Sequence, residues 1–122
     1  MKIFKFMVIM IFCITQGAMQ GILAATAQEG EASYYADSLN GQQTASGELY
    51  DKGALSAAHR SLPFGTKVKV TYLKSGLSVV VVINDRGPNA NDRIIDLSGA
   101  AAKRIGLIDA GHGRVRLEVI EP

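Results

Sequence analysis

The sequence predicts a small, mostly β domain that closes into a barrel of about six short strands with one short helix. Two observations carry this prediction. Short apolar runs, several of them alternating with polar residues, are separated by turn residues along the chain after residue 30. Only 95 residues remain once a predicted leader is set aside. Closing so many strands into a barrel removes the edges that an open sheet would expose.

The leader is predicted to be a secretory signal peptide over residues 1–27. Two lysines begin it, residues 6–14 are almost purely apolar, and small residues at 25–27 suit cleavage after Ala27. The apolar run is shorter than a membrane span requires, although an uncleaved anchor is the alternative. We therefore expect a protein secreted to the periplasm, with one domain at residues 28–122.

Without the leader the chain keeps 11 basic and 11 acidic residues, because Lys2 and Lys5 are removed. A neutral domain lacks the basic face that nucleic acids and anionic membranes require, so neither is expected as a partner. The single cysteine, Cys13, lies inside the apolar run and follows Phe12. We therefore expect no disulfide, no cysteine-bound zinc and no lipid anchor. No tight ligand spacing indicates a metal, and no cofactor is expected.

The first half of the domain is expected to hold three strands. Residues 32–36 form a short strand with Ser33 and Tyr35 on one face, and a loop rich in Asn, Gly, Gln, Thr and Ser follows. Small residues at 54–59 suit a second strand. Residues 67–73 alternate polar with apolar, as a half-buried strand does.

The second half adds three strands. Turn residues at 74–76 make a hairpin to a strand over 77–84, where five consecutive aliphatic residues at 79–83 suggest burial on both faces. Residues 94–97 form a short strand. Residues 113–120 alternate again and form the last strand.

The helix is expected over 100–105. Ser98 suits its N-cap, and Leu97, Ala101 and Ile105 share one helical face that would be buried. A six-strand, one-helix pattern of this length allows a single core.

Three titratable residues are the candidates for chemistry. Asp85 lies two residues beyond the aliphatic run at 79–83, so its strand would place an acid at the rim of the barrel. Glu48 and His59 lie upstream in settings flanked by glycine or alanine. Taken singly, each has a simpler interpretation: a turn stabilised by the Asp85 side chain, a solvated Glu48, and a half-buried His59 with its hydrogen bonds satisfied.

Five motifs then occur in order: Gly30-Glu31-Ala32-Ser33-Tyr34-Tyr35, Thr44-Ala45-Ser46-Gly47-Glu48, Ala57-Ala58-His59-Arg60-Ser61-Leu62-Pro63, Asn84-Asp85-Arg86-Gly87-Pro88 and Ile95-Asp96-Leu97-Ser98. Together they resemble the rare lipoprotein A family of bacterial cell-wall proteins over about residues 30–119. The resemblance implies a six-stranded double-psi β-barrel with one or two short helices. It also implies endolytic lytic transglycosylase activity on peptidoglycan. Such an enzyme cleaves the MurNAc–GlcNAc β-1,4 bond, forms 1,6-anhydroMurNAc, and prefers strands lacking stem peptides.

The resemblance places the family's required acid, histidine and aspartate at Glu48, His59 and Asp85. We expect Asp85 to protonate the leaving oxygen and then accept the proton of the C6 hydroxyl, with partial burial favouring its protonated form. Glu48 would position that hydroxyl or stabilise positive charge. His59 would orient a carboxylate or hydrogen-bond the sugar. The three side chains are expected to share one groove.

Four further residues are expected to contact the substrate. Tyr35 would stack on a sugar ring or pack within the barrel, and Thr44 and Asn84 would hydrogen-bond the sugar. Arg86 is also a substrate-contact candidate. If it paired instead with Asp85, the acid role of that carboxyl would weaken.

Some positions depart from the family pattern. Tyr34 stands where the family usually has tryptophan, and Asn89 where an aromatic residue is frequent. These departures favour the alternative function, a non-catalytic, expansin-like barrel that binds cell-wall glycan. Asp96 is expected to be a buried structural acid at the helix entrance, and His112 a surface turn. Peptidoglycan strands are the expected partner, no septal or cell-wall protein is identified, and we expect a monomer.

Overall fold

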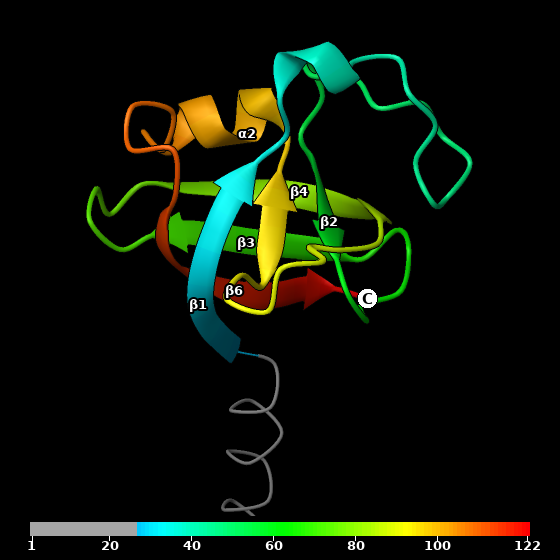
Figure 1. Ribbon diagram of the computed structural model, residues 1–122. Coiled ribbons are helices and arrows are strands. Elements are labelled where there is room, and N and C mark those ends of the chain that lie inside the picture. Colours follow the sequence, from blue (N-terminus) through cyan, green and yellow to red (C-terminus); the bar gives the residue numbers. More distant parts are fainter. Residues whose placement is uncertain (1–26) are drawn as a thin grey trace, which may run out of the picture.

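The computed structural model describes residues 27–122, which form a closed barrel of six strands (Figure 1). The strands are β1 (Ala27–Tyr34), β2 (Ser56–His59), β3 (Lys67–Tyr72), β4 (Ser78–Asp85), β5 (Ile95–Leu97) and β6 (Gly113–Glu121). A short 3-10 helix, η1 (Asp37–Leu39), and an α-helix, α2 (Gly99–Arg104), complete the elements. The predicted fold class is confirmed. All of the predicted signal peptide except Ala27 lies outside the described residues, so its cleavage site stays a prediction.

The strand order around the barrel is β1-β5-β2-β4-β3-β6, and β6 closes onto β1. The β1–β5 and β2–β4 pairs are parallel, whereas all other neighbours are antiparallel. Parallel partners cannot be joined by a tight hairpin, so the chain must cross between them. These crossings place segments from the beginning, middle and end of the domain side by side.

The aliphatic run in β4 is buried on one face only, so the prediction of burial on both faces was wrong. Val79, Val81 and Ile83 point inward and are at most 5% exposed, whereas Val80 and Val82 point outward and are 43% and 37% exposed. The physical reason is the closure of the barrel. Strands of a closed barrel alternate between interior and exterior, even where every residue is aliphatic.

This alternation predicts unequal costs for two chemically identical substitutions. Val81→Ala should lower the free energy of unfolding by about 2 kcal/mol, because it removes buried methyl groups and leaves a cavity. Val80→Ala, one residue away, should change it by about 0.5 kcal/mol or less. Urea unfolding of both variants checks the difference. Equal losses would mean that the outer face of β4 is also packed.

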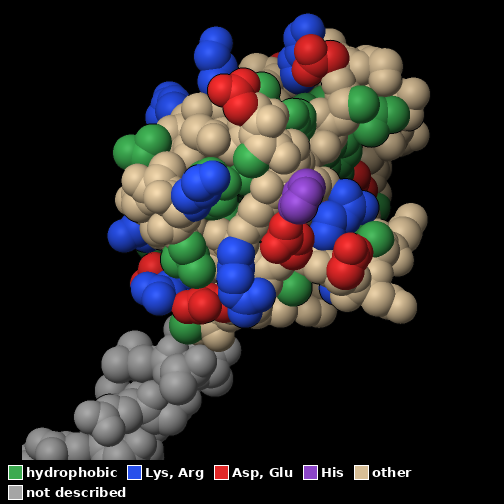
Figure 2. All heavy atoms as spheres, turned by 60° about the vertical axis from the view of Figure 1, so that its left-hand side comes forward, with side chains coloured by type: hydrophobic (Ala, Val, Ile, Leu, Met, Phe, Trp, Pro, Cys, Tyr) green, Lys and Arg blue, Asp and Glu red, His purple; other side chains and the backbone are tan. Residues whose placement is uncertain are grey.

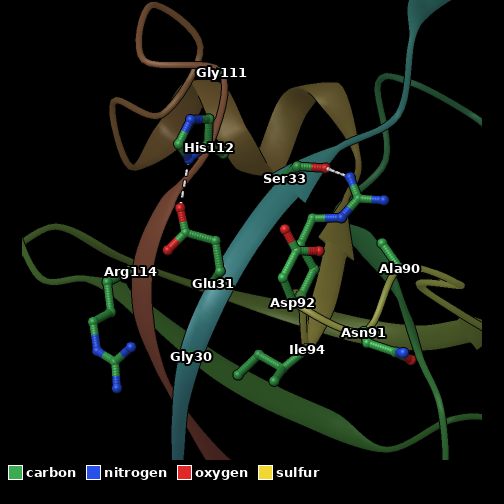
Figure 3. Close-up of a pocket in the computed structure, with 11 residues that line it drawn as sticks. Gly30, Glu31, Ser33, Ala90, Asn91, Asp92, Ile94, Gly111, His112 and Arg114 are labelled. Atoms are coloured by element: carbon green, nitrogen blue, oxygen red, sulfur yellow. Dashed lines mark hydrogen bonds and ion pairs between the residues drawn. The ribbon is translucent and has the colours of Figure 1, made fainter.

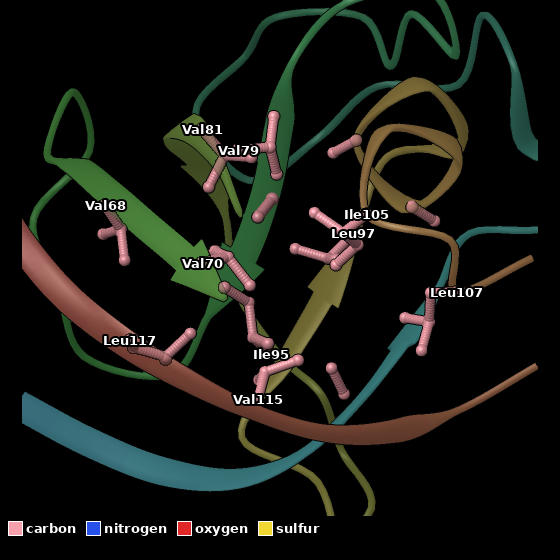
Figure 4. Packing of buried hydrophobic residues seen from close by; sticks show 14 of the residues in the cluster. Val68, Val70, Val79, Val81, Ile95, Leu97, Ile105, Leu107, Val115 and Leu117 are labelled. Atoms are coloured by element: carbon pink, nitrogen blue, oxygen red, sulfur yellow. The ribbon is translucent and has the colours of Figure 1, made fainter. Parts of the chain in front are cut away.

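Aliphatic side chains fill the interior of the barrel (Figure 4). The largest of those fully buried are Ile83, Ile95, Leu97, Ile105, Leu107, Val68, Val70, Val81 and Val115. In Figure 1, α2 lies across one end of the barrel, and two predictions for it are confirmed. Ser98 is its N-cap and accepts from the backbone N–H of Ala101. Leu97, Ala101 and Ile105 are all fully buried.

Charged side chains of both signs are interspersed on the face shown in Figure 2, which has no large single-sign patch. This surface is consistent with the balance of acids and bases in the sequence. Within residues 27–122, no helix has the length and apolarity needed to cross a bilayer.

Candidate active site

One row of paired residues crosses four strands and forms the floor of a groove. Ser33 of β1 pairs with Asp96 of β5. Asp96 pairs in turn with Ala58 of β2, which lies beside Asp85 of β4. All four residues line a groove of about 250 Å³. The strand order therefore converts distant sequence positions into one continuous surface.

A bulge in β4 sets the position of Asp85 in this row. Ala57 pairs with Ile83, but the next residue, Ala58, pairs with Asp85, so Asn84 is skipped. Bulges of this kind change the direction of the side chains that follow and often occur beside active sites. Directly after Asp85, Gly87 adopts a φ of +126°, a backbone conformation that favours glycine.

Three hydrogen bonds hold the Asp85 carboxylate. Its Oδ1 accepts from the backbone N–H groups of Ala45 at 2.8 Å and Arg86 at 2.9 Å, and its Oδ2 accepts from the Tyr35 hydroxyl. A carboxylate oxygen has about two acceptor sites, so Oδ1 is fully used and Oδ2 keeps one. Proton exchange with a molecule in the groove therefore belongs to Oδ2. Asp85 is half-buried, as expected.

Tyr35, which also lines the groove, holds Asp85 in place. Its ring stacks on that of Tyr50, with 4.4 Å between centroids and 18° between planes. Tyr50 is buried, and its hydroxyl accepts from the backbone N–H of Gly99 at 3.0 Å. Burial, together with the hydrogen bond to Asp85, raises the pKa of Tyr35 well above its usual value. The Tyr35 hydroxyl therefore stays protonated and remains a donor to Asp85.

Tyr35→Phe should remove this donor and leave the ring stack in place. In glycan cleavage we expect kcat to fall about 10- to 100-fold. The carboxylate formed on proton donation would lose one charge-assisted hydrogen bond, worth about 1.5–3 kcal/mol. The rate at which 1,6-anhydroMurNAc ends are released from peptide-free strands measures this loss.

Tyr34→Phe is the matched control. Tyr34 lines the same groove, but its hydroxyl donates to the backbone carbonyl of Ile108 at 2.8 Å and not to Asp85. Its kcat should equal that of the wild type. An unchanged kcat in Tyr35→Phe would contradict the role assigned to the Tyr35 hydroxyl.

The loop that carries Glu48 is attached to the end of β4. The backbone N–H of Ser46 donates to the carbonyl of Asn84 at 3.2 Å. The Thr44 hydroxyl is buried and donates to the carbonyl of Glu48 at 2.7 Å, so it stabilises the loop itself. The Glu48 side chain is exposed, and neither it nor Thr44 is among the residues that line the groove. The structure thus brings the backbone of the Glu48 loop into contact with Asp85 through Ala45, but it does not bring the Glu48 carboxylate into the groove.

The His59 ring turns toward a different pocket. Its Nδ1 accepts from the backbone N–H groups of Ser61 and Leu62, both at 3.1 Å, and its Nε2 lies 3.2 Å from Oε1 of Gln28. These contacts require the proton on Nε2 and a neutral ring. His59 and Gln28 line a pocket of about 320 Å³ together with Leu117. The prediction that the three side chains share one groove is therefore wrong for His59. The hydrogen-bonding groups of its ring are satisfied in the other pocket.

Burial also lowers the pKa of His59, and the charges of Arg86 and Arg60 lower it further. The ring is consequently neutral at physiological pH. The backbone of His59 still contacts the site, because its carbonyl accepts from Arg86 Nη1 at 3.1 Å.

Arg86 anchors the groove wall. Its Nη1 also donates to the Leu62 carbonyl at 2.8 Å, and its guanidinium lies 4.0 Å above the ring centroid of Phe64. The described residues contain no ion pair between Arg86 and Asp85; only the Arg86 backbone N–H reaches that carboxylate. The alternative of a neutralising Arg86–Asp85 pair is therefore wrong. Asn84 contributes its carbonyl to the loop and is not among the groove-lining residues.

A polar network lies at the other end of the floor. The sequence suggested that Arg93 could neutralise Asp96, and the structure confirms this contact, but the sequence did not indicate the part played by Ser33. Ser33 donates to Oδ1 of Asp96 at 3.0 Å, and Arg93 Nη1 lies 2.5 Å from the Ser33 hydroxyl and 3.5 Å from Asp96 Oδ1. The Asp96 side chain is 22% exposed, so it is less buried than expected. The sequence feature that could have indicated this network was Asp96 itself, a polar residue between the buried Ile95 and Leu97. Within residues 27–122, no three acidic, histidine or cysteine side chains converge as metal ligands.

Comparisons with known proteins show which family this chain resembles. The chain is 53% identical over 92 residues to the probable endolytic peptidoglycan transglycosylase RlpA of Synechocystis sp., covering 75% of this chain and 29% of that protein. It is 50% identical over 93 residues to the endolytic peptidoglycan transglycosylase RlpA of Pseudomonas aeruginosa, covering 76% and 27%. The chain therefore spans less than a third of these curated relatives.

A solved structure with a similar fold is that of the Streptomyces papain inhibitor. Its TM-score is 0.63 at 24% identity, covering 78% of this chain and 94% of that one. This similarity concerns the fold alone. A family model described as "Lytic transglycolase" (DPBB_1) matches residues 27–117, nearly the whole barrel. With this match, and with relatives at half identity across the same residues, the chain belongs to the DPBB_1 lytic transglycolase family.

Proposed function

We propose that this chain is an endolytic lytic transglycosylase that cleaves peptidoglycan glycan strands. The observation that carries the proposal is the Asp85 carboxylate, which is fixed by three donors on the floor of an open groove with one Oδ2 acceptor site left free. Family membership and the names of relatives at about half identity support the same reaction.

The reaction needs one group that first gives and then takes a proton. Asp85 Oδ2 protonates the glycosidic oxygen as the bond from C1 of MurNAc to O4 of GlcNAc breaks. The C6 hydroxyl of the same MurNAc attacks C1 and closes the 1,6-anhydro ring. Its proton passes to the Asp85 carboxylate, which restores the acid. No water is consumed, so a single carboxyl group balances both steps.

The other predicted catalytic residues act around this carboxyl group. Glu48 is exposed on the loop that contacts β4. We assign it the role of stabilising the positive charge that develops on the sugar. His59 is assigned a positioning role, because its Nδ1 orders the Ser61–Leu62 turn whose carbonyl binds Arg86. Tyr35 positions Asp85.

A preference for strands lacking stem peptides, a periplasmic location and a monomeric state belong to the same proposal. The resemblance carried by the ordered motifs supports the substrate preference, and the predicted signal peptide supports the location. Peptidoglycan is also named in the relatives' descriptions.

The test is to incubate the chain with intact sacculi and with strands freed of stem peptides, and to analyse the products by mass spectrometry. The proposal requires 1,6-anhydroMurNAc ends, with more of them from the peptide-free strands. Tight binding to the strands without any new ends would instead support the expansin-like binding function.

A further inference from the structure

A second, larger pocket adjoins the Asp85 groove. It has a volume of about 780 Å³ and is formed by β1, the loop before β5 and the turn before β6 (Figure 3). Ser33 and Arg93 line both the pocket and the groove. Because Arg93 is held there by Ser33 and Asp96, the two hollows meet at a fixed junction. A linear ligand in the groove can therefore continue into the pocket.

The walls of this pocket suit an uncharged, hydroxyl-rich ligand. Glu31 and His112 face each other across 2.5 Å, as the dashed line in Figure 3 shows. The remaining charged residues of the lining are Asp92, Arg93 and Arg114. The two acids and two arginines of the lining therefore balance in charge. Such a lining offers many hydrogen-bond donors and acceptors and no excess charge for an ion to recognise.

We infer that this pocket is a distal subsite that binds further sugar units of the same glycan strand whose bond is cleaved beside Asp85. This inference rests on the proposed function, since it takes the glycan strand as the ligand. Hydroxyl and acetamido groups would bond to Asn91 on one wall and to Arg114 on the other, both of which are exposed. Ligand pockets usually have volumes of about 300–1,000 Å³, so the second pocket is the better suited of the two to a whole sugar unit.

The subsite predicts that cleavage depends on strand length. A tetrasaccharide placed for cleavage at Asp85 has too few sugars to occupy the pocket fully, whereas a long strand fills both. The wild-type chain should therefore show a higher kcat/KM for long strands than for the tetrasaccharide. Arg114→Ala and Asn91→Ala should each lower kcat/KM for long strands about fivefold, the loss expected from one or two hydrogen bonds. The tetrasaccharide value should stay unchanged.

Arg116→Ala is the matched control. Arg116 lies on the same strand, is exposed, binds Glu29 at 3.0 Å and lines neither hollow. Arg116→Ala should leave kcat/KM unchanged for both substrates. The inference is overturned if the wild type shows no length dependence, or if Arg114→Ala and Asn91→Ala leave the long-strand advantage intact. It is also overturned if these variants lower kcat/KM equally for long strands and for the tetrasaccharide.

The same series separates this inference from the proposed function. If the wild type forms no anhydro ends on any strand, the proposed function fails. The subsite is then tested by the affinity of the chain for the tetrasaccharide and for long strands, measured by calorimetry. Tighter binding of long strands that Arg114→Ala abolishes would uphold it, and equal affinities would overturn it.

Discussion

Asp85→Asn is expected to reduce the release of 1,6-anhydroMurNAc ends by about 10²- to 10⁴-fold, the usual contribution of general acid–base catalysis. The amide cannot donate an acidic proton or accept one from the C6 hydroxyl. Its carbonyl oxygen can still accept from the N–H groups of Ala45 and Arg86, so the rim should keep its shape. Mass spectrometry of products from peptide-free strands measures the effect, and thermal unfolding verifies that the fold is retained.

Asp109→Asn is a suitable control for the loss of one acidic charge. Asp109 is exposed and lies outside the groove. This variant should release anhydro ends at the wild-type rate. If Asp85→Asn also retained the wild-type rate, Asp85 would be a structural residue and another group would have to supply the proton.

Ser98→Ala is expected to cause the largest loss of stability from a single hydroxyl, about 2–4 kcal/mol. The Ser98 hydroxyl is fully buried and makes every hydrogen bond available to it. It donates to the Ala54 carbonyl at 2.6 Å and accepts from the N–H groups of Ala101 at 3.2 Å and Ser56 at 3.3 Å. Alanine would leave these three backbone groups without their partner and would uncap α2.

Ser78→Ala provides the comparison, because the exposed Ser78 hydroxyl only contacts that of Thr71 at 2.9 Å. Its free energy of unfolding should change by about 0.5 kcal/mol or less. Chemical denaturation measures both variants. A similar small loss for Ser98→Ala would show that the junction between β2 and α2 does not depend on this hydroxyl.

Local periodicity predicted the elements of the fold well, because each strand and the helix carry their own patterns. Alternation in residues 67–73 identified β3, and Ser98 with its buried helical face identified α2. The β4 run was misread because five aliphatic residues carry no alternation of their own. Only the closure of the barrel decides which of them face solvent, and closure is a property of the whole chain.

The site was predicted in part. Asp85 could be identified because an acid lies two residues beyond an apolar run, and the structure places it in a groove. The direction of the His59 ring could not be predicted, since β2 is buried on both faces and no pattern distinguishes them. The row of Ser33, Asp96, Ala58 and Asp85 could not be predicted from the sequence either. It depends on pairings between distant strands and on a bulge that skips one residue.

The most direct test of the central claim is cleavage of peptide-free glycan strands in water enriched in oxygen-18. If Asp85 directs attack by the MurNAc C6 hydroxyl, each new end will be a 1,6-anhydro ring that contains no oxygen from the solvent. New reducing ends that carry the heavy isotope would show that water is the nucleophile, and the single-carboxyl mechanism would be wrong.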